Sequence, residues 1–237
     1  MRPLRHIVEP SRLLLTWQPA DINVQPRNRR TVAEIVPGRS SNDEWTFKYF
    51  LGSSDLVAAQ SAGFKGYPAF KLDEREFSLG VRDSLLRRLP PRNRDDFDAF
   101  LTVHRLPTPF VWSDLALVGY TGARLPSDGF AFVPEFPSDL DPCEFILEVA
   151  GVRHVYSGPI DQIKIGDPVT FVPEPENLVD SQAIAVFHND LKLGYVNTAL
   201  LPTVHRWLTC GVLTASVERK NGKVERPLIY VRAQFNC

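Results

Sequence analysis

The most informative segment in the second half of the chain is Val172-Pro-Glu-Pro-Glu-Asn-Leu-Val-Asp-Ser-Gln-Ala-Ile-Ala-Val186. The apolar ends of this stretch are typical of two strands, and the acidic, proline-containing segment between them is typical of a loop. Asn177 and Asp180 lie three residues apart in the loop, so their side chains can bond the local backbone or face a common ligand. Such residues more often build a loop than bind a ligand, and the loop alone leaves both roles open.

Short apolar segments separated by turn signals surround this loop. The predicted strands of the second half cover residues 145–149, 168–172, 183–187, 192–196, 213–218 and 228–235. One helix is predicted at residues 199–210, with Gly211 as its C-terminal cap. Many short strands with a single helix predict a mostly-β domain, either a small barrel or a curled sheet.

The first half is predicted to be an α+β domain. Strands are expected at residues 13–17, 31–36 and 45–50, and helices at residues 55–63, 81–89 and 93–104. Asn93 suits the N-cap of the last helix, and Asp95 and Asp96 suit its first turn. The segment from Phe132 to Pro142 holds three prolines and predicts a linker. We therefore expect two domains, at residues 1–140 and 141–237.

The composition is that of a soluble globular protein. The net charge of the 237 residues is −1, which excludes a chain-wide attraction to nucleic acid or membrane. Residues 1–30 are locally basic, with six arginines and two acids, as in a phosphate-binding arm or a solvated segment. Three scattered cysteines and the lack of a signal-like or membrane-spanning apolar stretch predict a cytoplasmic protein with no membrane partner.

Three further segments occur in a fixed order around the loop. They are Val149-Ala-Gly-Val-Arg-His-Val-Tyr-Ser-Gly158, Ile165-Gly-Asp-Pro-Val169 and Leu193-Gly-Tyr-Val196. Together with the loop they match, in order and spacing, a pattern of Gly-x-Arg, Gly-Asp, acidic-Pro-x-Asn-x-x-Asp and Gly-aromatic motifs. Over residues 144–236 the chain resembles the HIRAN domain family on these motifs.

The resemblance implies an OB-like β-barrel that, in helicase-linked eukaryotic members, captures the free 3′ end of single-stranded DNA. It implies that Arg153 contacts a backbone phosphate and that Asn177 and Asp180 hold the terminal sugar and its hydroxyl. A carboxylate accepts a bond from a hydroxyl and repels a phosphate, so Asp180 suits a strand end. Tyr195 is implied to lie beside the phosphate path. The candidate nucleic-acid-binding residues are Arg153, His154, Tyr156, Glu174, Asn177, Asp180 and Tyr195.

Three positions depart from the pattern of the end-binding members. His154 stands where the family has an aromatic residue, Val179 where it has a tyrosine, and Pro173 where it often has an arginine. Tyr156 is near enough in sequence to replace one of the lost rings. We therefore expect weak to moderate DNA binding.

Two segments of the first half carry a second resemblance. Arg88-Leu-Pro-Pro-Arg-Asn-Arg-Asp-Asp96 and Thr121-Gly-Ala-Arg-Leu-Pro-Ser-Asp128 resemble the N-terminal subdomain of HipA-type kinases, over about residues 11–136. In bacterial three-gene toxin–antitoxin operons, that subdomain exists apart from its kinase and acts as the antitoxin. The resemblance implies a partner-docking face with Arg88, Arg92 and Arg94, although charged residues of this kind more often form a solvated helix end.

The sequence shows no catalytic set. It contains no phosphate-binding Gly-x-x-x-x-Gly-Lys-Ser/Thr loop, no kinase core and no histidines or cysteines at metal spacing, so we expect neither enzymatic activity nor a cofactor. The expected function is non-catalytic DNA binding beside a partner-docking domain. Two alternatives stay open: a toxin–antitoxin-type regulator that binds a separate HipA-like kinase, and an accessory subunit of a DNA-processing helicase, nuclease or hydrolase.

Overall fold

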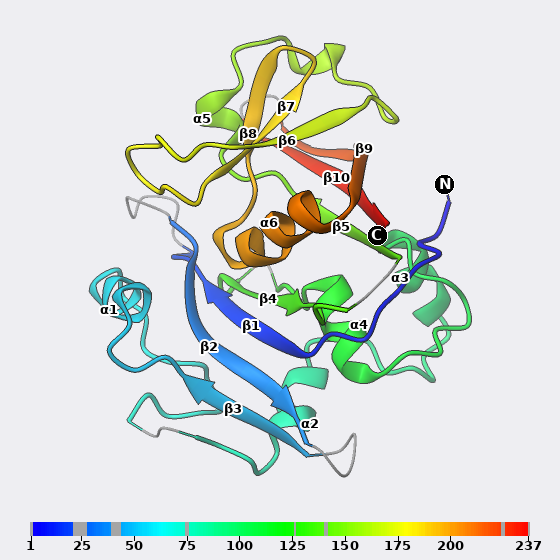
Figure 1. The fold of residues 1–237 in the computed structure, drawn as a ribbon. Coiled ribbons are helices and arrows are strands. Elements are labelled where there is room, and N and C mark those ends of the chain that lie inside the picture. Colours follow the sequence, from blue (N-terminus) through cyan, green and yellow to red (C-terminus); the bar gives the residue numbers. More distant parts are fainter. Residues whose placement is uncertain are drawn as a thin grey trace. The chain divides into compact units, whose positions relative to one another are not determined.

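The chain forms two compact units in the computed structural model (Figure 1). The structure describes residues 2–20, 28–38, 44–73, 76–125, 127–139, 142–223 and 226–236. The first unit comprises residues 1–4 and 9–137, and the second comprises residues 5–8 and 138–237. The chain as a whole is mostly β, with several small sheets and short helices. No helix among the described residues is long and apolar enough to cross a membrane.

The first unit is built on a four-stranded antiparallel sheet in the order β3-β2-β1-β4. Its strands are β1 (Arg12–Trp17), β2 (Arg30–Pro37), β3 (Trp45–Tyr49) and β4 (Phe130–Glu135). The three strands predicted from the sequence are present, but β4 was not predicted. The predicted linker therefore begins too early, because the buried apolar run of β4 continues through Pro134. Proline is compatible with β4 because the strand lies at the edge of the sheet.

Four helices accompany this sheet: α1 (Ser54–Ser61), α2 (Val81–Leu86), α3 (Phe97–Val103) and α4 (Asp114–Thr121). The helix predicted from Asn93 starts four residues later, at Phe97, because two tight turns precede it: the amide of Arg94 bonds the carbonyl of Pro91, and that of Phe97 bonds the carbonyl of Arg94. Helix α4 was missed. Its N-cap Ser113 accepts a bond from the amide of Ala116, and this capping pattern marked it in the sequence.

The second unit contains all six predicted strands, arranged in two three-stranded antiparallel sheets. One sheet has the order β5-β10-β9 and the other the order β6-β7-β8. The strands are β5 (Cys143–Glu148), β6 (Val169–Pro173), β7 (Ile184–His188), β8 (Leu191–Tyr195), β9 (Val212–Lys223) and β10 (Arg226–Asn236). The helical segments are α5 (Val152–Val155), η1 (Ile160–Gln162), η2 (Thr198–Leu200) and α6 (Leu201–Cys210). Trp207 of α6 is buried and stacks on Phe235 with ring centroids 5.6 Å apart.

The predicted OB-like barrel does not form, since no sheet closes on itself within the described ranges. Strands β9 and β10 pair with each other along their whole lengths, and β6, β7 and β8 form a separate meander. Isolated bridges, Ala150–Tyr195 and Pro168–Ser216, connect segments outside this regular pairing. Strand count and alternation do not determine which sheet edges pair, so the sequence could not separate two small sheets from one closed barrel.

Candidate nucleic-acid interface

The loop between β6 and β7 is closed by its own backbone. The amide of Glu174 donates to the carbonyl of Ala183 at 2.8 Å, and the amide of Ala183 donates to the carbonyl of Asp180 at 2.9 Å. A further turn joins the amide of Asn177 to the carbonyl of Glu174 at 3.0 Å. These bonds give the loop a defined shape on which its side chains are presented.

Asn177 holds the loop together from inside. Its Oδ1 accepts bonds from the amides of Val179 (3.0 Å) and Asp180 (3.2 Å), and its Nδ2 donates to Glu174 Oε2 at 2.9 Å. Asp180 Oδ1 accepts the amide of Gln182 at 2.9 Å. Both residues therefore build the loop, one of the two roles that the sequence left open. No bond joins the other carboxylate oxygen, Asp180 Oδ2, to a described residue.

Strand β8 contributes two more side chains to this loop. Lys192 forms an ion pair with Glu174, and the Tyr195 hydroxyl accepts bonds from Lys192 Nζ at 3.2 Å and from Asn177 Nδ2 at 3.4 Å. We call Glu174, Asn177, Lys192 and Tyr195 the loop cluster. Three of the predicted site residues are thus brought together, and one member was not foreseen.

Lys192 was missed for a geometric reason. In a regular strand, residues 192 and 195 face opposite sides because side chains alternate. The pairing of β7 with β8 shifts between Val186 and Phe187, where a bulge places an extra residue in β8. The bulge brings Lys192 and Tyr195 within bonding distance of each other, which alternation in the sequence does not reveal.

Charge within the loop cluster favours the ionised form of both partners. The hydrogen bond from Lys192, followed by that from Asn177, lowers the pKa of Glu174 below its ordinary value. The same contact with Glu174 raises the pKa of Lys192. The pair is only partly buried, so its net contribution to stability is modest.

Acid is expected to loosen this loop. Because the folded-state pKa of Glu174 is lowered, the pair stabilises the loop above the ordinary pKa of 4.5 and loses its effect as pH falls through the lowered value. Amide NMR shifts of Val179 and Asp180, followed from about pH 6 to about pH 3, should report this release. Glu174→Gln should remove the transition, whereas Glu176→Gln, at an exposed acid of the same loop, should leave it. Equal titrations in both variants would contradict the assignment.

Two glycines bring helix α5 beside β8. The backbones of Ala150 and Tyr195 exchange hydrogen bonds of 2.8 and 2.9 Å. A Cβ atom on Gly194 would lie 2.3 Å from the carbonyl oxygen of Ala150, so only glycine permits this approach. Gly151 then turns the chain into α5 with a φ of +76°, in the left-handed region that favours glycine.

The predicted residues of α5 are placed differently from the loop cluster. Arg153 and His154 are exposed, and Arg153 Nε donates to His154 Nε2 at 2.7 Å. Tyr156 is half-buried, with its hydroxyl so close to Gly158 that a Cβ there would lie 2.6 Å from it. No bond joins these three residues to the loop cluster in the described part of the chain.

The tip of the loop is apolar and exposed. Leu178 and Val179 have relative exposures of 103% and 95%, which is unusual for large apolar side chains on a folded surface. Val179 is the position at which the family pattern has a tyrosine. The loop thus presents two aliphatic side chains next to Asp180.

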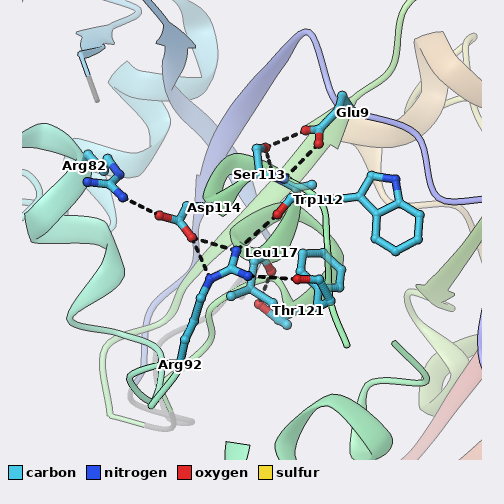
Figure 2. A network of polar contacts seen from close by, with 10 residues as sticks. Glu9, Arg82, Arg92, Trp112, Ser113, Asp114, Leu117 and Thr121 are labelled. Carbon is cyan, nitrogen blue, oxygen red and sulfur yellow. Dashed lines mark hydrogen bonds and ion pairs between the residues drawn. The ribbon is translucent and has the colours of Figure 1, made fainter. Parts of the chain in front are cut away.

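Arg92 of the first unit is engaged within its own unit. Figure 2 shows it beside Arg82, with both guanidinium groups approaching Asp114. Arg92 donates to Asp114 Oδ1 at 2.8 Å and to the carbonyls of Phe110 (3.0 Å) and Trp112 (3.2 Å). The bonds to the carbonyls of Phe110 and Trp112 fix the backbone that leads into α4. The N-cap of this helix, Ser113, also bonds the carboxylate of Glu9.

Arg88 is buried. Its side chain is 6% exposed, forms a two-bond pair with Asp128 at 2.7 and 3.1 Å, and donates to the carbonyl of Ala123 at 2.8 Å. Its guanidinium lies 5.6 to 5.8 Å from three aromatic ring centroids, those of Tyr67, Phe130 and Phe132. Arg88 therefore serves the packing of the first unit.

Arg94 differs from these two arginines because its side chain is 59% exposed and pairs only locally, with Asp96 at 2.6 Å. The docking role of Arg88, Arg92 and Arg94 stays a prediction, and Arg94 has the most exposed side chain of the three.

Comparison with known proteins identifies part of the chain. The model of the HIRAN domain family matches residues 143–222, which confirms the expected HIRAN domain for this segment and suggests a DNA-binding module. The match includes the loop cluster and α5. The resemblance of residues 11–136 to HipA-type kinases stays a prediction.

Two solved structures are similar to part of the chain. The crystal structure of the HIRAN domain of human HLTF is 17% identical, with 40% of this chain and 78% of that chain covered and a TM-score of 0.31. A protein from Lactobacillus plantarum is 18% identical, with coverage of 40% and 99% and a TM-score of 0.31. No curated protein gave a significant match.

Proposed function

We propose that residues 141–237 form a non-catalytic module that binds DNA through the loop cluster and α5, with the 3′ end of a single strand as its ligand. The observation that carries this proposal is the loop cluster itself, which lies within the segment matched by the HIRAN family model. The cluster holds the β6–β7 loop against β8 through Lys192 and Tyr195. Helix α5, which carries the exposed Arg153, packs against the same strand.

The chemistry of the loop suits a hydroxyl-bearing strand end. Asn177 fixes the backbone at Asp180, and Asp180 keeps one carboxylate oxygen without a bond to the described residues. A carboxylate accepts a bond from a free 3′-hydroxyl but repels a phosphate in the same place. Asp180 is therefore the residue that distinguishes a strand end from a continuous strand.

Arg153 supplies a positive charge for a phosphate. It is exposed on α5, and the pairing of Ala150 with Tyr195 ties that helix to the strand that carries the loop cluster. Contacts of arginine with phosphates position nucleic acid without reading its sequence. The module is thus suited to binding strands of any sequence.

Removal of the Arg153 charge tests this proposal. Anisotropy of a labelled single-stranded oligonucleotide should show Arg153→Ala binding several-fold more weakly, with a logarithmic salt slope shallower by about 0.7 for one lost phosphate contact. Arg94→Ala removes one exposed arginine from the first unit and should bind as the unaltered chain does. Affinities that are the same for all three proteins would contradict the role of α5.

A tyrosine at the loop tip should strengthen binding. Val179 is fully exposed, and an aromatic ring stacked on a base contributes about 1–3 kcal/mol, whereas an aliphatic side chain offers less. We expect Val179→Tyr to bind single-stranded DNA more tightly by roughly tenfold. The control is Val212→Tyr, which adds a tyrosine at an exposed position of β9 outside the loop. An equal gain in both variants would show non-specific stacking rather than a platform at the loop.

A further inference from the structure

The hairpin of β9 and β10 extends beyond its own sheet. The two strands pair from Val212–Asn236 to Lys223–Arg226, whereas β5 pairs with β10 only from Tyr230 to Phe235. The pairs formed by residues 226–229 thus lie outside the three-stranded region. This end of the hairpin is a two-stranded ribbon.

This end of the hairpin is basic, although the net charge of the whole chain is −1. Its cations are Lys220, Lys223 and Arg226, and Arg219 lies directly before them, opposite Tyr230. We call these four residues the basic hairpin, and residues 219–226 hold one acid, Glu225. Lys223 and Arg226 are exposed, and Lys220 is half-exposed with its Nζ bonded to the carbonyl of Ile160 at 3.3 Å. Arg219 lies over the ring of Tyr230, 4.2 Å from its centroid.

Three charges of the basic hairpin lack an acidic partner among the described residues. Within the described residues, no carboxylate forms an ion pair with Lys220, Lys223 or Arg226. By contrast, many arginines of the chain form ion pairs with nearby acids: Arg12, Arg30, Arg82, Arg88, Arg92, Arg94 and Arg232. A cluster of like charges such as Lys220, Lys223 and Arg226 is costly by self-repulsion and is typical of a surface that binds a polyanion.

The basic hairpin lies at the same end of the second unit as α5. The amide of Val149, just before α5, donates to the carbonyl of Ile229 in the ribbon at 2.9 Å, and α5 packs against β10 and β8. Lys220 is bonded to Ile160 in η1, which follows α5. Arg153 and the basic hairpin therefore belong to neighbouring elements of one unit.

We propose that the basic hairpin binds the backbone phosphates of the DNA strand whose end is held at the loop cluster. This inference rests on the proposed function and extends it from the terminal nucleotide to the body of the strand. Exposed lysine and arginine side chains neutralise phosphates and release counterions, which gives affinity without sequence preference. Binding should therefore grow with strand length and weaken steeply with salt.

Oligonucleotide length separates the two sites. Single strands of about 5 and about 16 nucleotides lie near the lower and upper ends of the usual site sizes on single-stranded DNA. The short strand reaches only the loop cluster, whereas the long strand can also reach the basic hairpin. The variant Lys220→Gln/Lys223→Gln/Arg226→Gln, made in the full chain, should bind the long strand on the order of tenfold more weakly, with a salt slope shallower by about 2. Its affinity for the short strand should be nearly unchanged. The double variant Lys223→Gln/Arg226→Gln keeps the bond from Lys220 to Ile160 and should show most of the same loss.

The control variant removes three charges from the first unit, Lys48→Gln/Lys65→Gln/Lys71→Gln, all at exposed positions. It should bind both strands as the unaltered chain does. This inference would be overturned if the hairpin variants kept the affinity and salt slope of the unaltered chain for the long strand. That result would leave the proposed function standing, and it is expected if the hairpin binds an acidic protein partner. Equal losses in the hairpin and control variants would also overturn it. Failure of the unaltered chain to bind either strand would overturn the proposed function as well.

Discussion

Replacing Arg88 with alanine is expected to lower the free energy of unfolding of the first unit by about 3–5 kcal/mol, the usual effect of removing one partner of a buried ion pair. The change leaves Asp128 without its two-bond partner and the carbonyl of Ala123 without its donor. It also opens a space among the rings of Tyr67, Phe130 and Phe132. Chemical denaturation followed by tryptophan fluorescence would measure the loss.

Two further variants define the cause of this effect. Arg88→Lys keeps the charge but cannot form the two-bond pair, so its free energy of unfolding should fall between those of the alanine variant and the unaltered chain. Arg94→Ala breaks only an exposed ion pair and should leave the free energy of unfolding nearly unchanged. If Arg88→Ala and Arg94→Ala unfolded at the same denaturant concentration, Arg88 would not have the structural role assigned to it.

Replacing Gly194 with alanine is expected to disrupt the second unit and its DNA binding together. The added Cβ would lie 2.3 Å from a backbone oxygen of Ala150 and 2.7 Å from Val149 Cγ1, so the segment between β5 and α5 must move. Overpacking of this kind costs about 1–3 kcal/mol, and the upper end is expected because the obstacle is backbone. Since the displaced segment leads into α5, Arg153 should move away from β8, and DNA affinity should fall by more than the loss of stability explains.

Gly166→Ala is the matched control. An added Cβ at Gly166 meets no atom within 4 Å, although its φ of +94° makes any side chain strained. Its cost of about 1–2 kcal/mol is therefore conformational. Hydrogen exchange should show faster exchange at the amides of Ala150 and Tyr195 in the Gly194 variant only. Equal exchange and equal DNA affinity in the two variants would show that the contact of Gly194 with Ala150 does not position α5.

Local patterns predicted the strands well, because alternation and turn residues are local properties of the sequence. The arrangement of those strands was not local. β9 and β10 pair along their full lengths and leave β6, β7 and β8 as a separate sheet, which replaces the expected barrel. β4 was obscured by Pro134, since an edge strand tolerates a residue that a central strand excludes.

The candidate site was predicted in part for the same reason. The sequence placed Glu174, Asn177 and Asp180 in one loop because they are neighbours in the chain. It could not place Lys192 with them, because a bulge in β8 breaks the alternation. Nor could it show that Arg88 pairs with Asp128, forty residues further along the chain. This pairing buries Arg88, whereas Arg94, six residues later, stays exposed.

The central claim is that Asp180 at the loop recognises a free strand end, and one titration tests it most directly. The same single-stranded oligonucleotide is presented with a 3′-hydroxyl and with a 3′-phosphate, at several salt concentrations. We expect the unaltered chain to bind the hydroxyl form roughly tenfold more tightly, because the carboxylate repels the added phosphate, and we expect Asp180→Ala to abolish this preference. Equal or negligible binding to both ends, unchanged by Asp180→Ala, would contradict it.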